Sequence, residues 1–279
     1  MPDKIDKIGS SMVHHGKSSN RVYVMSLDYN DLSIITQKLD DLAAENEYTK
    51  IVVKAPVSHK DVFESCGYQI EAVIPKFYNG ENDGCFLCKY FDDNRKIDPL
   101  NDKCREILEL ALKKGLEPYR ATEKDGFICR QATESDIPEM VEVYSKVFKS
   151  YPFPINNNSY LLSTMRENVI YYGIWDNNKL VALSSIELYT KYNHAEMTDF
   201  AVLNEYRGKG YAQHLLQKME NKLPSLHIKT AFTIARAKSA GMNIAFAKNG
   251  YSYAGKLTNN TDIAGQIESM NVWYKNLKY

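Results

Sequence analysis

The pattern of hydrophobic and polar positions predicts the same series of elements twice along the chain. "YTKIVVKAP" is predicted as a strand, "SHKDVFESCGY" as a helix, and "QIEAVIPKFY" and "GCFLCKYF" as two more strands. The order returns near the C-terminus as "TAFTIARAK", "AGMNIAFAKNGY", "SYAGKLTNN" and "ESMNVWYKNL". Both helices end in F-x-x-x-G-Y, which can recur by chance because glycine often ends a short helix. Because the flanking strands match as well, we favour a true repeat.

The segment between the two copies predicts a connecting helix and a linker. "DDNRKIDPLNDKCREILELALKKGLEPYRATEKDG" is highly charged, places Ile107, Leu110 and Ala111 at helical spacing and contains the helix stop "GLEP". We therefore expect an N-terminal domain over residues 1–125, including this helix and linker, and a second domain over residues 126–279.

The second domain is predicted as a mainly antiparallel sheet with covering helices. "FICRQATESDIPEMVEVYSKVF" gives a strand and then a helix opened by Thr133 and Asp136. "VIYYGIWDNNKLVALSSIELY" gives a hairpin that turns between Asp176 and Asn178, and "AEMTDFAVL" gives a further strand. The fold class that follows is α+β, arranged as an α/β sandwich.

"NEYRGKGYAQHLLQKME" follows that strand directly and places two glycines before a helix with apolar residues at helical spacing. A glycine-rich turn at a helix N-terminus leaves several backbone N–H groups without partners, with the positive end of the helix dipole behind them. Such a turn binds anions, most often phosphate. The sequence therefore predicts a phosphate-bearing ligand at residues 207–212.

Composition and charge narrow the classes of function. Lysine plus arginine and aspartate plus glutamate both number 35, so no overall charge attracts nucleic acid or anionic lipid. No apolar stretch reaches the roughly 20 residues that span a bilayer, and the N-terminus lacks a signal-peptide core. We expect a cytoplasmic protein with no nucleic-acid or membrane partner.

Two cysteines and two histidines need separate interpretation. Cys85 and Cys88 form a C-x-x-C motif, but residues three apart on a strand point to opposite faces and do not converge on a metal. His14 and His15 lie in a polar stretch and are expected to be solvated. The sequence therefore predicts no metal site.

Arg207-x-x-Gly210-x-Ala212, between a strand and a helix, resembles the acetyl-CoA signature of the GNAT N-acetyltransferases. The order of elements from Phe127 to Leu277 and the opening "R-x-A-T-x-x-D-I-x-x-M" fit the same family. The resemblance implies a GNAT fold in the second domain, acetyl-CoA as co-substrate and acetyl transfer to an amine. Because "PVSHKDVF" carries no glycine turn, the first domain is expected to be a GNAT-like half-domain that binds no coenzyme.

The whole chain more narrowly resembles the β-lysine N-acetyltransferases, through "RVYVMSL", "FESCGYQIEAVIPKFYNG", "AKSAGMNIAFAKNGY" and "ESMNVWYKNL". This implies acetylation of the side-chain (epsilon) amine of β-lysine, giving the compatible solute N-epsilon-acetyl-β-lysine, and a functional link to a lysine aminomutase that supplies β-lysine. Another amine acceptor, such as lysine, a polyamine or a protein lysine, stays open. A regulatory module that binds acetyl-CoA without chemistry, and a homodimer, stay open too.

The resemblance implies a set of coenzyme contacts at the glycine turn, on the strand before it and on the last helix. They are Phe200, Ala201, Val202, Arg207, Gly208, Lys209, Gly210, Tyr211, Ala212 and Asn243. The N–H groups from Gly208 to Ala212 would hold the pyrophosphate, and the Val202 N–H the acetyl oxygen. For the side chains of Tyr211 and Ala212, packing of the helix against the sheet is the favoured interpretation.

A carboxylate is needed because a lysine-type amine has a pKa of about 10.4 and arrives charged at neutral pH. Glu196 shares a strand face with Val202 at period two, whereas Asp199 has the opposite parity and Glu187 lies on the preceding strand. We therefore choose Glu196 as the catalytic base. The family often uses a tyrosine as general acid where this chain has Phe246, so the acid is left unassigned.

Substrate selection is expected on loops near the acetyl group. The proline-broken "KSYPFPINNN" offers Tyr151 and Phe153 as walls for an aliphatic chain. "YTKYNHAEM" and "TNNTDI" offer polar partners, and "PKFYNG" of the first domain could close over them. The sequence singles out no arginine or lysine as the partner of the substrate carboxylate.

Overall fold

The computed structural model describes residues 3–117 and 126–278. The N-terminal half consists of the elements β1 (Lys4–Ile8), β2 (Ser11–Gly16), β3 (Arg21–Ser26), α1 (Ile35–Glu45), β4 (Lys50–Pro56), α2 (Lys60–Glu64), β5 (Gln69–Tyr78), β6 (Asn82–Tyr90) and α3 (Asn101–Gly115). The C-terminal half consists of β7 (Phe127–Gln131), α4 (Ile137–Val147), α5 (Asn158–Glu167), β8 (Val169–Asp176), β9 (Lys179–Tyr189), β10 (His194–Val202), α6 (Tyr211–Glu220), β11 (Thr230–Arg236), α7 (Ala240–Lys248), β12 (Ser252–Ile263) and β13 (Gln266–Asn276).

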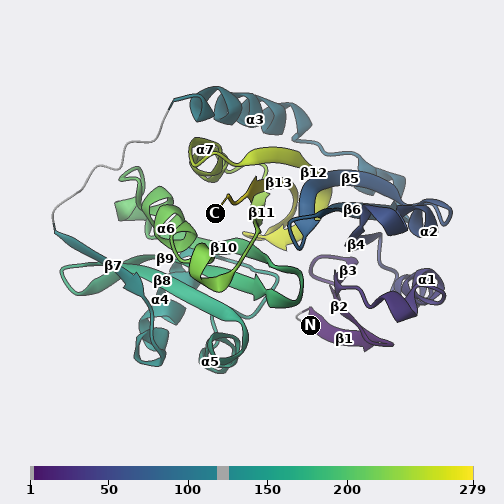
Figure 1. Ribbon diagram of the computed structural model, residues 1–279, viewed down its shortest axis with the longest axis horizontal. Helices are drawn as coiled ribbons and strands as arrows, with labels where there is room; N and C mark the ends of the chain where they lie inside the picture. Colours follow the sequence, from purple (N-terminus) through teal and green to yellow (C-terminus); the bar gives the residue numbers. More distant parts are fainter. Residues whose placement is uncertain (1–2, 118–125, 279) are drawn as a thin grey trace.

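The strands of the described ranges form one sheet of 13 strands, in the order β1-β2-β3-β4-β6-β5-β12-β13-β11-β10-β9-β8-β7 (Figure 1). The two halves join where β5 meets β12, at the pair Ala72 and Gly255. A Cβ at Gly255 would lie 2.1 Å from the carbonyl oxygen of Glu71 and 2.6 Å from the Cα of Ala72. Only glycine allows the two backbones to approach this closely.

The strand pairing repeats in the two halves. β3 runs parallel to β4, which pairs antiparallel with β6, and β6 pairs with β5. In the same way β10 runs parallel to β11, which pairs antiparallel with β13, and β13 pairs with β12. The loop before α1, residues 27–34, contains no glycine, unlike the turn before α6. The predicted boundary at residue 125 lies outside the described residues, and the division into domains stays a prediction.

Clusters of buried hydrophobic side chains hold the layers together. In the N-terminal half α1 and α2 cover the outer face of the sheet, where Ile35, Leu39 and Phe63 pack on the strands. The inner face of that half packs against the C-terminal half, with Phe86 and Phe232 in one cluster. Figure 1 shows α6 on one side of the C-terminal strands and α4 and α5 on the other, while α3 lies against α7.

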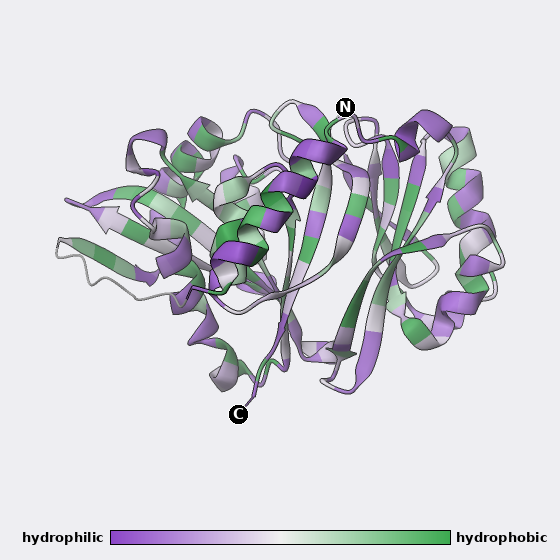
Figure 2. Ribbon diagram, turned by 90° about the horizontal axis from the view of Figure 1, so that it is seen from above, coloured by the Kyte–Doolittle hydropathy of each residue, from purple (hydrophilic) through white to green (hydrophobic). Residues whose placement is uncertain are grey.

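Hydrophobic and hydrophilic bands alternate along the strands in Figure 2, as expected where one face is more deeply buried than the other. The predicted α+β class and the mainly antiparallel second half are confirmed. The helix α2 spans only five residues, shorter than the pattern suggested, and α1 and α5 were not predicted. No helix within residues 3–117 and 126–278 has the length and apolar character to cross a bilayer.

The cysteine prediction is confirmed and the histidine prediction is wrong. Cys85 packs in the cluster under α1 and α2, whereas Cys88 packs in the cluster between the halves, so their side chains face opposite ways. His14 and His15 are buried, at 1% and 3% exposed, because β2 runs inside the sheet between β1 and β3. Nothing in the local polarity of the N-terminal stretch indicated that pairing.

Candidate active site

A cavity of about 670 Å³ lies between the two halves and brings most of the predicted site residues together. Those of them that line it are Tyr151, Phe153, Glu196, Phe200, Val202, Arg207, Gly208, Gly210, Tyr211 and Ala212. Its walls come from β10, the turn before α6, α7, the loop after α4, and from β3 and β12 on the other side. The site is therefore shared by both halves of the chain.

The cavity opens where β10 separates from β11. The two strands pair in parallel only from His194 to Glu196, after which β11 continues with β13 alone. On its other edge β10 has a bulge between Thr198 and Ala201, where Asp199 takes a left-handed φ of 56°. The gap leaves backbone groups of β10 beyond Glu196 without a β11 partner, so they can pair with an extended ligand.

The turn before α6 has the geometry of an anion site. Gly208 and Gly210 have φ of 76° and 79°, and no described atom lies within 4 Å of a Cβ built on either. The backbone N–H groups of Gly208, Gly210, Tyr211 and Ala212 have no hydrogen-bond partner within the described chain, and α6 has no side-chain cap. These open N–H groups, with the helix dipole behind them, fit a pyrophosphate such as that of acetyl-CoA.

Three carboxylates face the same cavity. Glu196 on β10 lies directly opposite Glu187 on β9, and the bulge turns Asp199 toward the same space. The period-two argument that separated Asp199 from Glu196 was therefore wrong, because a bulge reverses the alternation of side chains. Asp199 accepts hydrogen bonds from the hydroxyls of Tyr151 (2.6 Å) and Ser185 (2.5 Å).

Glu196 has the properties of a base that works near neutral pH. Burial and the neighbouring Glu187 raise its pKa to about 8, while Lys54 and the backbone N–H of Ile234 favour its charged form. Burial also raises the pKa of Glu187 and of Asp199. A proton is therefore held among these carboxylates in the neutral range.

Lys54 on β4 is the buried cation behind these acids. It is 4% exposed, its Nζ lies 4.1 Å from the centre of the Tyr189 ring, and it has no hydrogen-bond partner among the described residues. Burial lowers the pKa of Lys54, and the charges of Glu196 and Glu187 act in the opposite direction. Lys54 belongs to the N-terminal half, so that half adjusts the charge of the site.

Some predicted site residues lie elsewhere. Asn243 is fully buried, and its amide group is used within the protein: Nδ2 donates to the carbonyls of Arg236 and Ser239, and Oδ1 accepts from Asn271 and from Trp273 Nε1. We therefore correct its assignment from coenzyme contact to a residue that fixes the start of α7.

Ala201, Lys209 and the segment "PKFYNG" also lie away from the cavity walls. The Ala201 side chain is in the core, and Lys209 lies over the Tyr206 ring at 4.6 Å. "PKFYNG" does pack on "YTKYNHAEM" as expected: the Asn79 N–H donates to the carbonyl of Tyr192 at 2.8 Å, and Phe77 stacks on His194 with 4.0 Å between ring centres. It lines no part of the cavity wall.

Sequence reasoning missed the contribution of the N-terminal half. Arg21, Tyr23 and Met25, which alternate along β3, all line the cavity. Their alternation within "RVYVMSL" indicates that the three side chains share one face of a strand. Nothing in the sequence showed that this face lies across the cavity from β10. His14 also reaches the site, where its Nε2 donates to the carbonyl of Pro152 (3.1 Å). Burial lowers the pKa of His14 to about 4, so the ring is neutral near pH 7.

Comparison with known proteins gives the family. The model of the acetyltransferase (GNAT) family matches residues 137–251. The β-lysine N(6)-acetyltransferase of Methanococcus maripaludis is 38% identical over 273 residues, 98% of each chain. The N-acetyltransferase YodP of Bacillus subtilis is 32% identical over 276 residues, 96% of each chain. The β-lysine N(6)-acetyltransferase of Methanosarcina mazei is 31% identical, covering 87% of this chain and 97% of its own.

The glycine turn, the opened strand and the similarity over nearly the full chain lead to one conclusion. The chain belongs to the GNAT family, within it to the family of the β-lysine N(6)-acetyltransferases, and is an acetyl-CoA-dependent N-acetyltransferase.

Proposed function

We propose that this enzyme transfers the acetyl group of acetyl-CoA to the distal amine of β-lysine, at N6, and leaves the β-amine free. Two relatives that share almost the whole chain carry that activity in their names. The observation that carries the proposal is Glu196, a carboxylate with a pKa of about 8 in the cavity that also holds the glycine turn.

Acetyl-CoA supplies an acetyl thioester, and the residues of the turn and of β10 are arranged to hold it. The N–H groups of residues 208–212 receive the pyrophosphate, and the Arg207 guanidinium, whose Nε donates to the Val202 carbonyl at 3.3 Å, adds positive charge beside it. The opened edge of β10 pairs with the amides of the pantetheine arm. The Val202 N–H stabilises the negative charge that develops on the acetyl oxygen.

Glu196 prepares the acceptor. An ammonium with a pKa of about 10.4 must lose a proton before its nitrogen can attack, and a base whose pKa is closer to that value accepts the proton more readily. The nitrogen then bonds to the acetyl carbon, the carbon–sulfur bond breaks, and the thiolate takes a proton. The buried ring at Phe246 has no proton to give, so the side chain at that position takes no part in this last transfer.

We extend the proposal to the source and the use of the substrate. β-Lysine is lysine with one amino group moved to the neighbouring carbon, so a lysine aminomutase is the reaction class that supplies it. Acetylation removes one of its two ammonium charges and leaves a molecule with no net charge at neutral pH. That property suits a compatible solute, which accumulates without disturbing charged surfaces.

A panel of amines tests the choice of acceptor. Thiol release from acetyl-CoA is followed with β-lysine, lysine, a polyamine and a lysine-containing peptide. We expect kcat/KM for β-lysine to exceed that for each of the others by at least about tenfold, a difference that complementary polar groups readily produce. A higher kcat/KM for another amine would overturn the acceptor, and no thiol release with any amine would overturn the proposed catalysis.

A further inference from the structure

Arg21 is a buried guanidinium in the wall of the cavity, and no anion of the described residues pairs with it. The residue is 4% exposed, and its Nε has no hydrogen-bond partner within residues 3–117 and 126–278. Among the described residues no carboxylate forms an ion pair with Arg21. Asp3, whose charge acts on it, instead accepts hydrogen bonds from the backbone N–H groups of Ser18 and Ser19. The centre of the Tyr23 ring lies 5.1 Å from the guanidinium carbon.

A second buried guanidinium strengthens the positive charge there. Arg95 donates from Nε to the carbonyl of Asn259 (2.8 Å), from one terminal nitrogen to the carbonyl of Ser19 (2.6 Å) and from the other to Thr49 Oγ1 (2.9 Å), all neutral acceptors. Burial, and then the charge of Arg21, lowers the pKa of Arg95 to about 10. Burying two cations costs free energy when no anion of the described residues pairs with them. This region is therefore suited to bind an anion from outside the protein.

Asn260 on β12 offers a hydrogen-bond acceptor in the same cavity. Its side chain is 2% exposed, and its Nδ2 donates to Thr261 Oγ1 at 3.1 Å. Its Oδ1 is buried and has no donor partner within the described chain. A buried carbonyl oxygen without a donor costs free energy unless a ligand supplies one, and an ammonium group supplies up to three.

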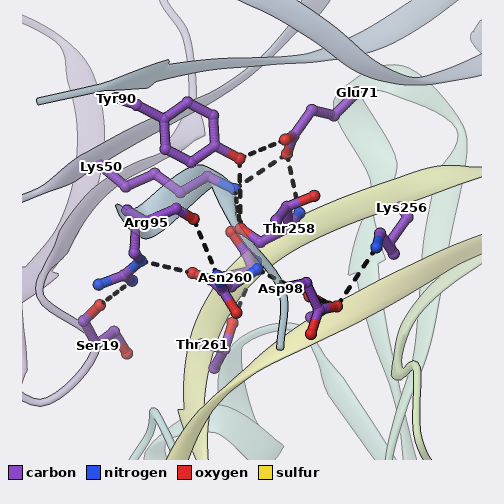
Figure 3. Close-up of polar contacts among 12 residues, drawn as sticks. Ser19, Lys50, Glu71, Tyr90, Arg95, Asp98, Lys256, Thr258, Asn260 and Thr261 are labelled. Carbon is purple, nitrogen blue, oxygen red and sulfur yellow. Dashed lines mark hydrogen bonds and ion pairs between the residues drawn. The ribbon is translucent and has the colours of Figure 1, made fainter. Parts of the chain in front are cut away.

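Contacts across the two halves fix this part of β12 (Figure 3). The strand pairing of β12 is irregular between Leu257 and Thr261. Lys50 Nζ donates to the carbonyl of Thr258 at 2.7 Å and to Glu71 at 3.0 Å, and Glu71 accepts from the Thr258 N–H at 3.2 Å. Arg95 links the next carbonyl, that of Asn259, to Ser19, two residues before Arg21. The network therefore fixes the backbone just before Asn260 and, through Ser19, the chain just before Arg21.

The spacing along β3 relates Arg21 to the catalytic carboxylate. Arg21 and Tyr23 face the cavity from alternate positions, which are roughly 6.6 Å apart along a strand. Tyr23 and Glu196 line the same cavity, of about 670 Å³. The cavity therefore offers a six-carbon chain a path between the Arg21 guanidinium and Glu196.

We propose that Arg21 binds the carboxylate of the acceptor and that Asn260 accepts a hydrogen bond from its β-ammonium group. This assignment rests on the function proposed above. Fixing these two groups at the junction of the halves directs only the distal amine toward Glu196. The N-terminal half thus binds the substrate carboxylate through Arg21, while the C-terminal half supplies Asn260, Glu196 and the coenzyme site.

Three acceptors separate the two contacts in the wild-type enzyme. 6-Aminohexanoate keeps the carboxylate and lacks the β-amine, whereas 1,4-diaminopentane keeps both amines and lacks the carboxylate. We expect kcat/KM to fall by roughly 100-fold when the carboxylate is missing and by at least about tenfold when the β-amine is missing. Equal kcat/KM for β-lysine and 1,4-diaminopentane would overturn the role of Arg21 without needing a variant.

Arg21→Met is then measured on the same acceptors, with Arg21→Lys as the conservative variant. The methionine should lower kcat/KM roughly 100-fold for both acceptors that carry a carboxylate and by less than about threefold for 1,4-diaminopentane, and the lysine should restore part of the loss. Asn260→Ala should lower it for β-lysine and leave 6-aminohexanoate unchanged. A uniform loss on all three acceptors, with acetyl-CoA affinity kept, would show a structural role for Arg21 and contradict the proposal.

The wild-type panel also keeps this inference distinct from the proposed function. If the wild type acetylates β-lysine well and Arg21→Met leaves that rate unchanged, only the carboxylate site fails. If the wild type prefers an amine that has no carboxylate, the proposed acceptor fails as well. Loss of acetyl-CoA binding in Arg21→Met would indicate misfolding, and the decision then passes to Arg21→Lys and to the wild-type comparison.

Discussion

Glu196 on β10 and Glu187 on β9 lie directly opposite each other in the sheet, and both side chains line the cavity. Opposite positions on neighbouring strands bring two side chains close together, so two charged carboxylates there repel each other. Lys54, from the other half of the chain, is the cation that partly offsets this repulsion. The reactivity of Glu196 therefore depends on residues from both halves.

Glu196→Gln should lower kcat by roughly 100-fold or more with little change in acetyl-CoA affinity, because the amide keeps the shape of the side chain but cannot take a proton. Steady-state kinetics and calorimetry measure the two effects. The matched control is Glu205→Gln, which removes an exposed carboxylate that pairs with Lys179 at 3.7 Å. Equal rates for Glu196→Gln and the wild type would remove Glu196 from the mechanism.

The rate of the wild-type enzyme should rise with pH through about 8, because the base must be deprotonated and the pKa of Glu196 is raised to that value. Lys54 favours the charged form of Glu196, so Lys54→Met should raise the pKa further and move the midpoint of the kcat profile to higher pH. Lys146→Met, which removes an exposed lysine of α4, should leave the midpoint in place. A midpoint that stays fixed or moves to lower pH in Lys54→Met would contradict this coupling.

Gly210→Asp should abolish acetyl-CoA binding, since a carboxylate at the turn repels the pyrophosphate and fills the space it needs. Gly250→Asp is the control for backbone strain, because Gly250 has the same φ of 79° and equally open surroundings at the end of α7. Calorimetry should show one coenzyme per chain for the wild type and for Gly250→Asp. Affinity within a few-fold of the wild type in Gly210→Asp would refute the phosphate assignment.

Gly255→Ala should destabilise the protein by about 2 kcal/mol or more, because the new Cβ would collide with the backbone of β5 at the junction of the halves. Gly241→Ala is the matched control: it lies in α7 with nothing within 4 Å of its Cβ, so it should be neutral or slightly stabilising. Urea unfolding compares the two free energies. Equal stability of both variants would show that the close approach of β5 and β12 does not require glycine at residue 255.

The parts of the site that depend on local chemistry could be predicted from the sequence. The turn at Gly208 and Gly210 was recognisable because positive φ and an uncapped helix start are properties of a short segment. Cys85 and Cys88 were separable by strand alternation for the same reason. Asp199 was misplaced because the bulge that turns it inward forms only when β10 pairs with β9.

The contribution of the N-terminal half could not be predicted, because it depends on how distant strands face each other. Arg21 and Glu196 are far apart in the sequence, and only the junction of β5 with β12 brings their strands to one cavity. The burial of His14 follows from the same arrangement. Asn243 was assigned to the coenzyme by family resemblance, from its place on the last helix, but Asn271 and Trp273 donate hydrogen bonds to its side chain.

The position of the acetyl group in the product tests the central claim most directly. β-Lysine is incubated with acetyl-CoA and the full-length enzyme, and the product is examined by NMR for the carbon whose attached protons shift on acylation. The account predicts a single product acetylated at N6, formed with one free thiol per acetyl group, because the cavity admits only the distal amine to Glu196. A product acetylated at the β-amine, or a mixture of both, would contradict it.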